Sequence, residues 1–416
     1  MPKKILIIAP GYSKNSTDPC CKEIYRFLSV LSEKRKQDTF YVLTSQKEKT
    51  RGNIVCFHID QYNRLCDRIE KINPRHFLIK KIANRLFWKR AVSNLFNATK
   101  FGHATYFMDQ TKFEHWIKKH ADLCKNIDFV FTFSNPFYQH EYGSKIIEQS
   151  PNAAWYSFFY DSFADSPSCK NVFEAVERED RIFERANKIF TLKELVENCK
   201  NSNMNKYPEK ICFIPNTSIA DYTDWTRTAT QNKQRDKISL FYSGRFDEKI
   251  RNPERMLKVV AGLPNCFQAV FYSRGCEKQV GEFQNQFPEK FETHGFLQDQ
   301  DEYNRKIAGA DFLVIVGNSA GNQIPSKFAE YISFGKPIIY FQSIDDDLAI
   351  REYGNYSLLL VVSNKAPINE AVSEIQSFCK KNIAKTLDYA TICNLFHSNT
   401  LEYLTDILTN QMTIDQ

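Results

Sequence analysis

Between Gly317 and Phe341 the sequence reads GNSAGNQIPSKFAEYISFGKPIIYF, and its polar and charged residues could bind a phosphorylated ligand. Ser326 follows a proline and is a residue type that often begins a helix. The backbone N–H groups at a helix start bind anions, and Lys327 would add a positive charge there. Glu330 comes about one turn later, where its carboxylate could accept hydrogen bonds from a ribose diol. The spacing therefore predicts a site for a diphosphate joined to a ribose.

The same segment has the strand, helix, strand order that such a site needs. A helix is expected over 326–334, between two apolar runs that are typical of buried strands. Gly335 is expected just past the helix end, in the left-handed conformation. Capping of the helix would explain Ser326 and Gly335, but it would not explain Lys327 and Glu330 in the same frame.

A second group of basic residues follows the sequence FYSGR at 241–245, which ends a predicted strand. Gly244 and Arg245 stand at the strand end, and Lys249 and Arg251 come next. A guanidinium group can bind a phosphate through two parallel hydrogen bonds, so Arg245 suits the same diphosphate. An ordinary surface ion pair is the alternative for a lone arginine.

Both groups lie in the second of two similar halves in which strands and helices alternate. In the first half, strands are expected at 4–9, 40–43, 129–133, 155–159, 188–191 and 211–214, with helices at 21–34 and 172–186. In the second half, strands are expected at 238–242, 268–272, 291–294, 312–316 and 337–341, with helices at 253–262, 277–286, 300–308 and 326–334. This alternation predicts two tandem Rossmann-like, doubly wound α/β domains facing a cleft, with the ligand at the carboxyl ends of the strands.

The expected domain boundaries follow from the changes in composition along the chain. They are an N-terminal domain at 1–216, a polar linker at 217–237, a nucleotide-binding domain at 238–385 and a helical tail at 386–416. The tail is expected to pack back on the N-terminal domain.

Composition excludes several classes of protein. The net charge of +7 fits an anionic ligand, but no compact basic stripe indicates nucleic acid. The 12 cysteines contain no C-x-x-C pair and are typical of reduced thiols, so a cytoplasmic protein is expected. The apolar run after Lys4 is expected to be a strand and not a signal peptide, and we find no run of about 18 apolar residues that could span a membrane. The motifs G-x-G-x-x-G, G-x-x-x-x-G-K-[ST] and H-E-x-x-H are absent, which disfavours dinucleotide enzymes, P-loop proteins and zinc proteases.

Residues 73–120 are helical in pattern, basic and aromatic. Such a segment is typical either of an amphipathic helix packed on its own domain or of peripheral contact with an anionic membrane surface or lipid-linked acceptor.

The segment 325–339 resembles the donor-binding motif of the GT-B glycosyltransferases, especially the family 4-like enzymes of bacterial polysaccharide assembly. The likeness rests on PSK at 325–327, on Glu330-Tyr331 and on GKPII at 335–339. FYSGR at 241–245 is similar to the strand end of the same domain in that family.

The resemblance implies transfer of a sugar from a UDP- or GDP-linked donor to a saccharide or lipid-linked saccharide acceptor, with retention and without a metal or other cofactor. By this resemblance, Glu330 would bind the ribose, and Arg245 with Lys249 or Arg251 would bind the pyrophosphate. His294 and Gly295 would lie next to the nucleobase. Ser326 and Lys327 would contribute to the site from the start of the helix. Asn322 stands where many relatives have a second glutamate that contacts the donor sugar, which leaves the donor open.

The chemistry expected is electrostatic. Arg245 and Lys249 would stabilise the leaving diphosphate, and domain closure would bring the acceptor hydroxyl to the sugar. An inverting reaction would also need a base in the first half, where Asp161, His140 and His103 are candidates. The runs DQD at 299–301 and DDD at 345–347 contain the D-x-D pattern of some metal sites, but both border predicted helices, where aspartate caps are expected.

Two other functions use the same pocket. A nucleotide-sugar 2-epimerase would need acid and base groups and no acceptor, so product analysis without acceptor would separate it. A non-catalytic nucleotide-sugar-binding subunit would bind the donor without turnover, and Asn322 is the residue that allows this interpretation.

Overall fold

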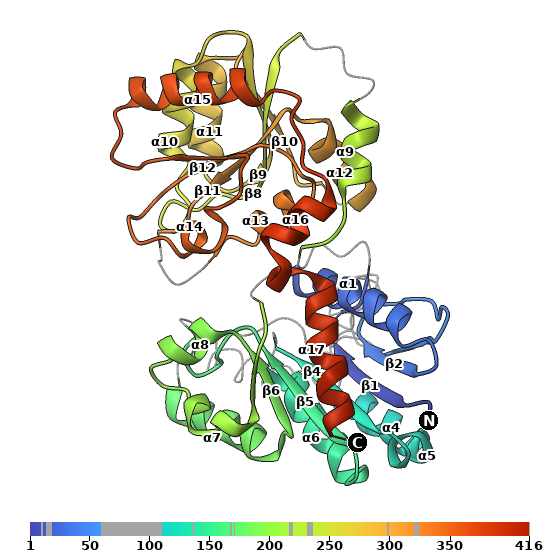
Figure 1. Cartoon of the computed structure of the whole chain (residues 1–416). Coiled ribbons are helices and arrows are strands. Elements are labelled where there is room, and N and C mark those ends of the chain that lie inside the picture. The colour runs from blue at the N-terminus through green and yellow to red at the C-terminus, as the bar shows by residue number, and fades with distance from the viewer. Residues whose placement is uncertain are drawn as a thin grey trace, which may run out of the picture. The chain divides into compact units, whose positions relative to one another are not determined.

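The computed structural model describes residues 1–9, 11–13, 19–59, 110–134, 137–166, 169, 171–215, 219–230, 236–297, 299–319 and 324–415. Within these residues the chain divides into two compact units (Figure 1). Unit 1 comprises Met1–Pro215 and Ile407–Gln416, and unit 2 comprises Asn216–Asp406.

Unit 1 is built on a parallel sheet that has seven strands in the described residues, in the order β3-β2-β1-β4-β5-β6-β7. The strands are β1 (Lys4–Ala9), β2 (Thr39–Thr44), β3 (Ile54–His58), β4 (Phe129–Phe133), β5 (Ala154–Phe159), β6 (Lys188–Thr191) and β7 (Ile211–Phe213). The helices are α1 (Pro19–Lys34), α4 (Gln110–Lys119), α5 (Ala121–Lys125), α6 (Tyr138–Gln149), α7 (Val172–Arg185) and α8 (Lys193–Asn198), with short 3-10 turns at Met204–Lys206 and Pro208–Lys210. β1 is buried from Ile5 to Ala9 because a central parallel strand is covered on both faces.

Unit 2 has a parallel sheet with six strands in the part of the chain that is described, in the order β10-β9-β8-β11-β12-β13. The strands are β8 (Ile238–Arg245), β9 (Phe267–Arg274), β10 (Phe291–His294), β11 (Phe312–Val316), β12 (Ile338–Phe341) and β13 (Leu359–Val362). The helices are α9 (Thr223–Thr230), α10 (Glu254–Gly262), α11 (Glu277–Gln286), α12 (Gln300–Gly309), α13 (Lys327–Ile332), α14 (Leu348–Tyr353), α15 (Ile368–Asn382) and α16 (Tyr389–Leu395), with a 3-10 turn at His397–Asn399.

Both sheets share one strand order, in which the first strand of the unit lies between the second and the fourth. This order confirms the expected pair of Rossmann-like domains, because it is the order of doubly wound α/β sheets. The sequence analysis did not assign β3, β13, α14 or α15, although the apolar runs IVCF at 54–57 and LLLVV at 358–362 carry a strand signal.

The C-terminal helix α17 (Leu401–Ile414) returns the chain to unit 1, as expected. The hydroxyl of the buried Tyr156 on β5 donates a hydrogen bond to Asp415 at 2.5 Å. The thiol of Cys212 on β7 lies 3.9 Å from the side-chain oxygen of Gln411. These contacts attach the end of the chain to two strands of the first sheet.

The polar stretch expected as a linker at 217–237 contains the helix α9. α9 packs against α12, and the hydroxyl of Thr226 donates to the carbonyl oxygen of Phe334 at 2.8 Å. The sequence analysis missed this helix because its apolar face consists only of Trp225 and Ala229, one turn apart, among polar residues.

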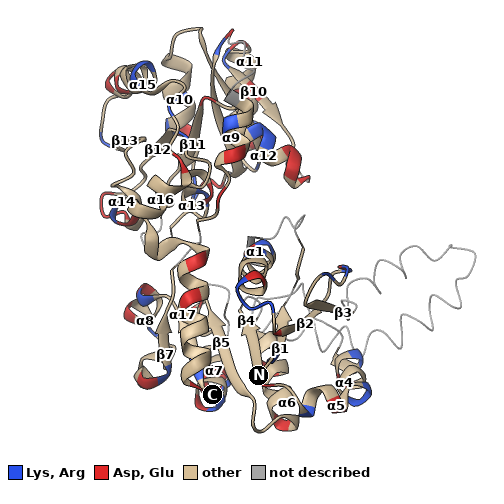
Figure 2. Ribbon diagram, turned by 45° about the vertical axis from the view of Figure 1, so that its right-hand side comes forward, with Lys and Arg blue, Asp and Glu red and all other residues tan. Residues whose placement is uncertain are grey.

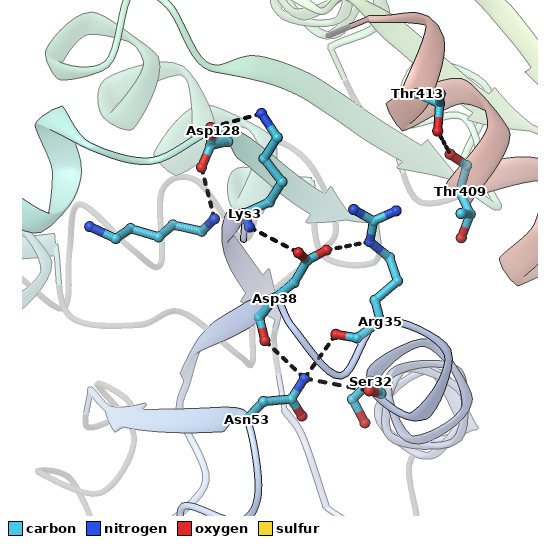
Figure 3. A network of polar contacts seen from close by, with 9 residues as sticks. Lys3, Ser32, Arg35, Asp38, Asn53, Asp128, Thr409 and Thr413 are labelled. Atoms are coloured by element: carbon cyan, nitrogen blue, oxygen red, sulfur yellow. Dashed lines mark hydrogen bonds and ion pairs between the residues drawn. The ribbon is translucent and has the colours of Figure 1, made fainter. Parts of the chain in front are cut away.

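A polar network joins the amino ends of the unit 1 strands (Figure 3). The carboxylate of Asp38, which is 1% exposed, accepts hydrogen bonds from the Lys3 backbone N–H at 2.9 Å and from Arg35 Nε. Asn53 Nδ2 donates to the Asp38 carbonyl oxygen at 2.9 Å. This edge is opposite the strand ends that bind ligands in such folds, and the network ties neighbouring strands of the sheet together there.

Most of the basic, aromatic segment 73–120 lies outside the described residues. Its described end forms α4, whose Phe113 and Trp116 are buried in the core of unit 1. Among the residues that the structure describes, no helix combines the length and the apolar character needed to cross a bilayer. Lys and Arg residues are interspersed with Asp and Glu over both units (Figure 2).

Candidate functional site

The sheet of unit 2 opens at its carboxyl edge between β8 and β11. β8 pairs with β11 only as far as Phe241, whereas it pairs with β9 up to Arg245. On the open side, the buried hydroxyl of Tyr331 on α13 accepts a hydrogen bond from the backbone N–H of Ser243 at 3.2 Å. Tyr331 therefore fixes α13 at the point where doubly wound sheets bind their ligands.

Replacing Tyr331 with phenylalanine is expected to lower the free energy of unfolding by about 1–3 kcal/mol, because the buried Ser243 N–H loses its acceptor. Urea unfolding followed by circular dichroism measures the change. Tyr403→Phe is the matched control, since no hydrogen bond of that hydroxyl is found in the described part of the chain. Equal stability of the two variants would show that Tyr331 does not carry this bond.

The basic residues after β8 form a short loop that is tied to the end of β11. The carboxylate of Asp247 accepts hydrogen bonds from the N–H groups of Lys249 at 3.0 Å and Ile250 at 3.1 Å, and these bonds lower its pKa. Ser319, three residues after β11, donates its N–H to the Ile250 carbonyl oxygen at 2.7 Å. Arg251 donates from Nε and Nη2 to the side-chain oxygen of Asn318 at 3.0 and 2.8 Å. The loop is thus held against the next strand end.

Arg245 and Lys249 remain accessible to a ligand on this loop. The Arg245 side chain is 66% exposed, and its ion pair with Asp247 is long, at 3.9 Å. Lys249 is exposed, whereas Arg251 is half-buried and occupied by Asn318. The surface ion pair considered as an alternative for Arg245 is present, but a pair this long and exposed holds the guanidinium weakly. Arg245 and Lys249 are therefore exposed cations at this edge of the sheet.

A compact group of three side chains lies beside α13. Lys327 Nζ lies 2.7 Å from Glu330 Oε2, and the hydroxyl of Tyr303 on α12 donates to the same carboxylate oxygen at 2.9 Å. The Lys327 charge was expected to add directly to the helix start, but the structure shows it paired with Glu330. The Glu330 carboxylate keeps 11% of its side-chain surface exposed, so it faces the surface from a fixed position.

Ser326 does not cap the helix as its residue type suggests. Its backbone is in the right-handed helical region, with φ −55° and ψ −20°, and its side chain makes no capping hydrogen bond. α13 has only six residues, because Ser333 and Phe334 belong to the turn that follows it. A helix this short concentrates little charge at its end, so an anion here depends on side-chain cations more than on the helix.

His294 and Gly295 lie at the end of the edge strand β10. The His294 ring stacks on Tyr272 of β9 with ring centres 4.6 Å apart, and its Nε2 lies 2.5 Å from Glu292. The ammonium group of Lys306 on α12 lies over the ring of Tyr272, 5.7 Å from the ring centre. Gly295 is exposed, and an added Cβ there would meet no atom within 4 Å. The exposed ring and the open glycine beside it are compatible with a flat base.

Both D-x-D runs cap or border helices, as expected. Asp299 accepts a hydrogen bond from Glu302 N at 2.7 Å, and Asp347 accepts one from Ala349 N at 2.9 Å. Asp345 pairs with Lys365 at 2.5 Å and Asp346 with Arg351. The carboxylates of Asp299, Asp345, Asp346 and Asp347 are therefore used by the protein itself.

In unit 1, Asp161 follows β5 and is exposed. The surrounding chain partly desolvates the Asp161 carboxyl, and this raises the pKa of Asp161. The loop after it is held by the buried Glu179 of α7, whose Oε1 accepts N–H bonds from Phe163 at 2.6 Å and Ala164 at 3.3 Å. Burial raises the pKa of Glu179 to about 7. Asp161 is thus an accessible carboxylate on an anchored loop.

His140, one of the candidate bases considered for an inverting reaction, lies in the core of unit 1. Its ring is fully buried, stacks on Phe159 at 4.1 Å and shares a 2.7 Å hydrogen bond with Thr132. Burial lowers the pKa of His140 to about 3, because the charged imidazolium cannot be solvated there. His103 lies outside the described residues.

Among the expected site residues, the structure places Gly244 and Arg245 at the end of β8 and Lys249 and Arg251 in the loop that follows. It also brings Lys327 and Glu330 together on α13. Asn322 lies outside the described residues, and Asp161 belongs to the other unit. Sequence reasoning missed Tyr303, Tyr272 and Asn318. Tyr303 and Glu330 are 27 positions apart, so no local spacing could have indicated their contact.

No family model matches the sequence, and no curated protein matches it. Solved structures do. HepE of Anabaena, in complex with UDP and glucose, is 12% identical, with 99% of each chain covered and a TM-score of 0.58. A UDP-forming trehalose-phosphate synthase of Burkholderia xenovorans, in complex with glucose-6-phosphate, is 10% identical over 99% of this chain and 100% of its own, with a TM-score of 0.59. The chain therefore has the GT-B fold.

Proposed function

We propose that this chain is a glycosyltransferase whose nucleoside diphosphate sugar donor binds at the carboxyl edge of the unit 2 sheet. The acceptor is a saccharide or lipid-linked saccharide of cell-surface polysaccharide assembly, and the reaction retains the configuration of the transferred sugar. Similar structures that contain UDP with glucose, or glucose-6-phosphate, support a sugar nucleotide and a sugar as its two substrates.

One observation carries the proposal: a fixed carboxylate and an exposed arginine share one edge of a parallel sheet. Tyr331, the neighbour of Glu330, binds the backbone of Ser243, and Ser243 lies two residues before Arg245 on β8. Glu330 suits the diol of a ribose, and Arg245 suits the diphosphate attached to it. Together they match the two polar parts that every ribonucleoside diphosphate has, a ribose diol and a diphosphate.

In this proposal the protein acts through binding and electrostatics. Arg245 and Lys249 stabilise the charge that develops on the leaving diphosphate, and Arg251 holds the loop that carries them. Asp161 is assigned to the acceptor side, where its carboxyl could orient the attacking hydroxyl. No metal or other cofactor is required, since cationic side chains supply the positive charge.

We also propose a cytoplasmic location, with peripheral membrane contact as the alternative for residues 73–120. The ten cysteines whose state is described are all free, which fits a reducing compartment.

Glu330→Ala is expected to lose most of the nucleotide binding, because the ribose diol loses its acceptor. A thermal-shift screen of UDP, GDP, CMP and their sugars identifies the nucleotide that stabilises the wild type. Titration calorimetry of that nucleotide should then give a dissociation constant at least about tenfold higher for the variant, since a hydrogen bond to a charged group contributes about 1.5–3 kcal/mol.

Glu254→Ala serves as the control, because it removes an exposed carboxylate from α10 and should leave binding unchanged. A wild-type protein that no nucleotide stabilises would refute the proposed function. A transferase forms a transfer product when the acceptor is present, whereas an epimerase forms an epimer of the donor sugar without any acceptor. Nucleotide binding without either product indicates a non-catalytic subunit.

A further inference from the structure

The hydroxyl of Tyr303 lies where it can set the orientation of the Glu330 carboxylate. Tyr303 is on α12, whose start is fixed by Asp299, and its ring belongs to the apolar core of unit 2 with only 6% of its surface exposed. A ring packed in this way has little rotational freedom, so the direction of its hydroxyl is set by the core.

The hydroxyl forms a triangle with the two charged groups of α13. It lies 2.9 Å from Glu330 Oε2 and 2.5 Å from Lys327 Nζ, and Lys327 Nζ lies 2.7 Å from the same carboxylate oxygen. The ammonium group also stands over the Tyr303 ring, 4.7 Å from its centre. Because an ammonium has no acceptor, Lys327 donates to Tyr303, and Tyr303 in turn donates to Glu330.

Lys327 and Tyr303 restrain the orientation of the Glu330 carboxylate to different degrees. Lys327 is a point charge on a flexible stem and would follow the carboxylate as it rotates. The phenol gives one directed bond from a rigid ring, so it sets the rotation of the carboxylate. Tyr303 and Lys327 both bind Oε2, and a carboxylate has about four acceptor positions in all, so these two bonds do not use its whole capacity.

We propose that Tyr303 is a positioning residue that orients Glu330 toward a ribose diol and so makes the site select ribonucleotides over 2′-deoxyribonucleotides. The inference rests on the proposed function, because it takes the ribose to be the ligand of Glu330. Tyr303 itself acts through Glu330. Its removal should therefore weaken only the part of binding that involves the ribose hydroxyls.

The test measures the dissociation constants of UDP and 2′-deoxy-UDP for the wild type and for Tyr303→Phe by titration calorimetry. If the wild type prefers GDP, GDP and 2′-deoxy-GDP are used in their place. The wild type should bind UDP at least about tenfold more tightly than 2′-deoxy-UDP. In Tyr303→Phe the affinity for UDP should fall about five- to tenfold, and the affinity for 2′-deoxy-UDP should change less than twofold. The discrimination should thus largely disappear, and KM for the donor should rise more than kcat falls.

Tyr356→Phe is the control for a merely structural effect. It removes a buried tyrosine hydroxyl from the same core, one that donates to the Lys336 carbonyl oxygen at 3.0 Å, and it should leave the UDP to 2′-deoxy-UDP ratio unchanged.

Equal losses for both nucleotides in Tyr303→Phe, or no loss for either, would overturn the role of Tyr303 while leaving the proposed function intact. A wild type that binds no nucleotide would instead overturn both. A ratio that falls in Tyr356→Phe as well would assign the effect to stability.

Discussion

Replacing Arg245 with alanine is expected to lower kcat/KM for sugar transfer by about 100- to 1000-fold. Arg245 is the exposed guanidinium at the end of β8, and the proposed reaction leaves a diphosphate beside it. Removing one hydrogen-bond donor to the charge that develops in a transition state costs about this much in other enzymes. Initial rates over a range of donor concentrations measure the effect, and kcat should account for most of it.

Two companion variants sharpen the result. Arg245→Lys keeps the charge but loses the planar fork, so it should recover only part of the rate. Arg227→Ala removes an exposed arginine from α9, where it pairs with Asp224, and should retain full activity. An Arg245→Ala enzyme with wild-type kcat/KM would show that the loop after β8 does not contact the leaving group.

Gly335→Ala is expected to lower the free energy of unfolding by about 3 kcal/mol or more. Gly335 has φ +65°, a conformation that costs other residues about 1–3 kcal/mol. An added Cβ would also lie 2.1 Å from the carbonyl oxygen of Leu387, which is backbone that cannot move without breaking the Leu387 N–H bond to Gly335. Urea unfolding followed by circular dichroism measures the loss.

Gly281→Ala provides the opposite case within the same unit. Gly281 lies inside the helix α11, and a Cβ there would meet no atom within 4 Å. Alanine should therefore stabilise the protein by about 0.5–1 kcal/mol, because it loses less backbone entropy on folding than glycine does. A Gly335→Ala protein as stable as the wild type would show that the turn after α13 relaxes without cost.

The left-handed turn at Gly335 also illustrates what local sequence can predict. Glycine followed by Lys336-Pro337 after an apolar helix indicates that conformation directly, and the structure confirms it. Strands such as β1 and β11 were equally clear, because uninterrupted apolar runs of about five residues are typical of buried parallel strands. The sequence analysis missed α9 because its apolar face is short. It missed β13 because the apolar run of that strand lay outside the motifs that were considered.

The sequence by itself determined two doubly wound domains and the basic and acidic residues at the strand ends of the second, because strand periodicity and turn residues are local properties. Only the tertiary structure decided what those residues do. It buried His140 in the core, paired Lys327 with Glu330, and brought Tyr303 to that pair from another helix. Contacts of this kind depend on how strands and helices pack, and packing joins residues whose separation along the chain carries no signal.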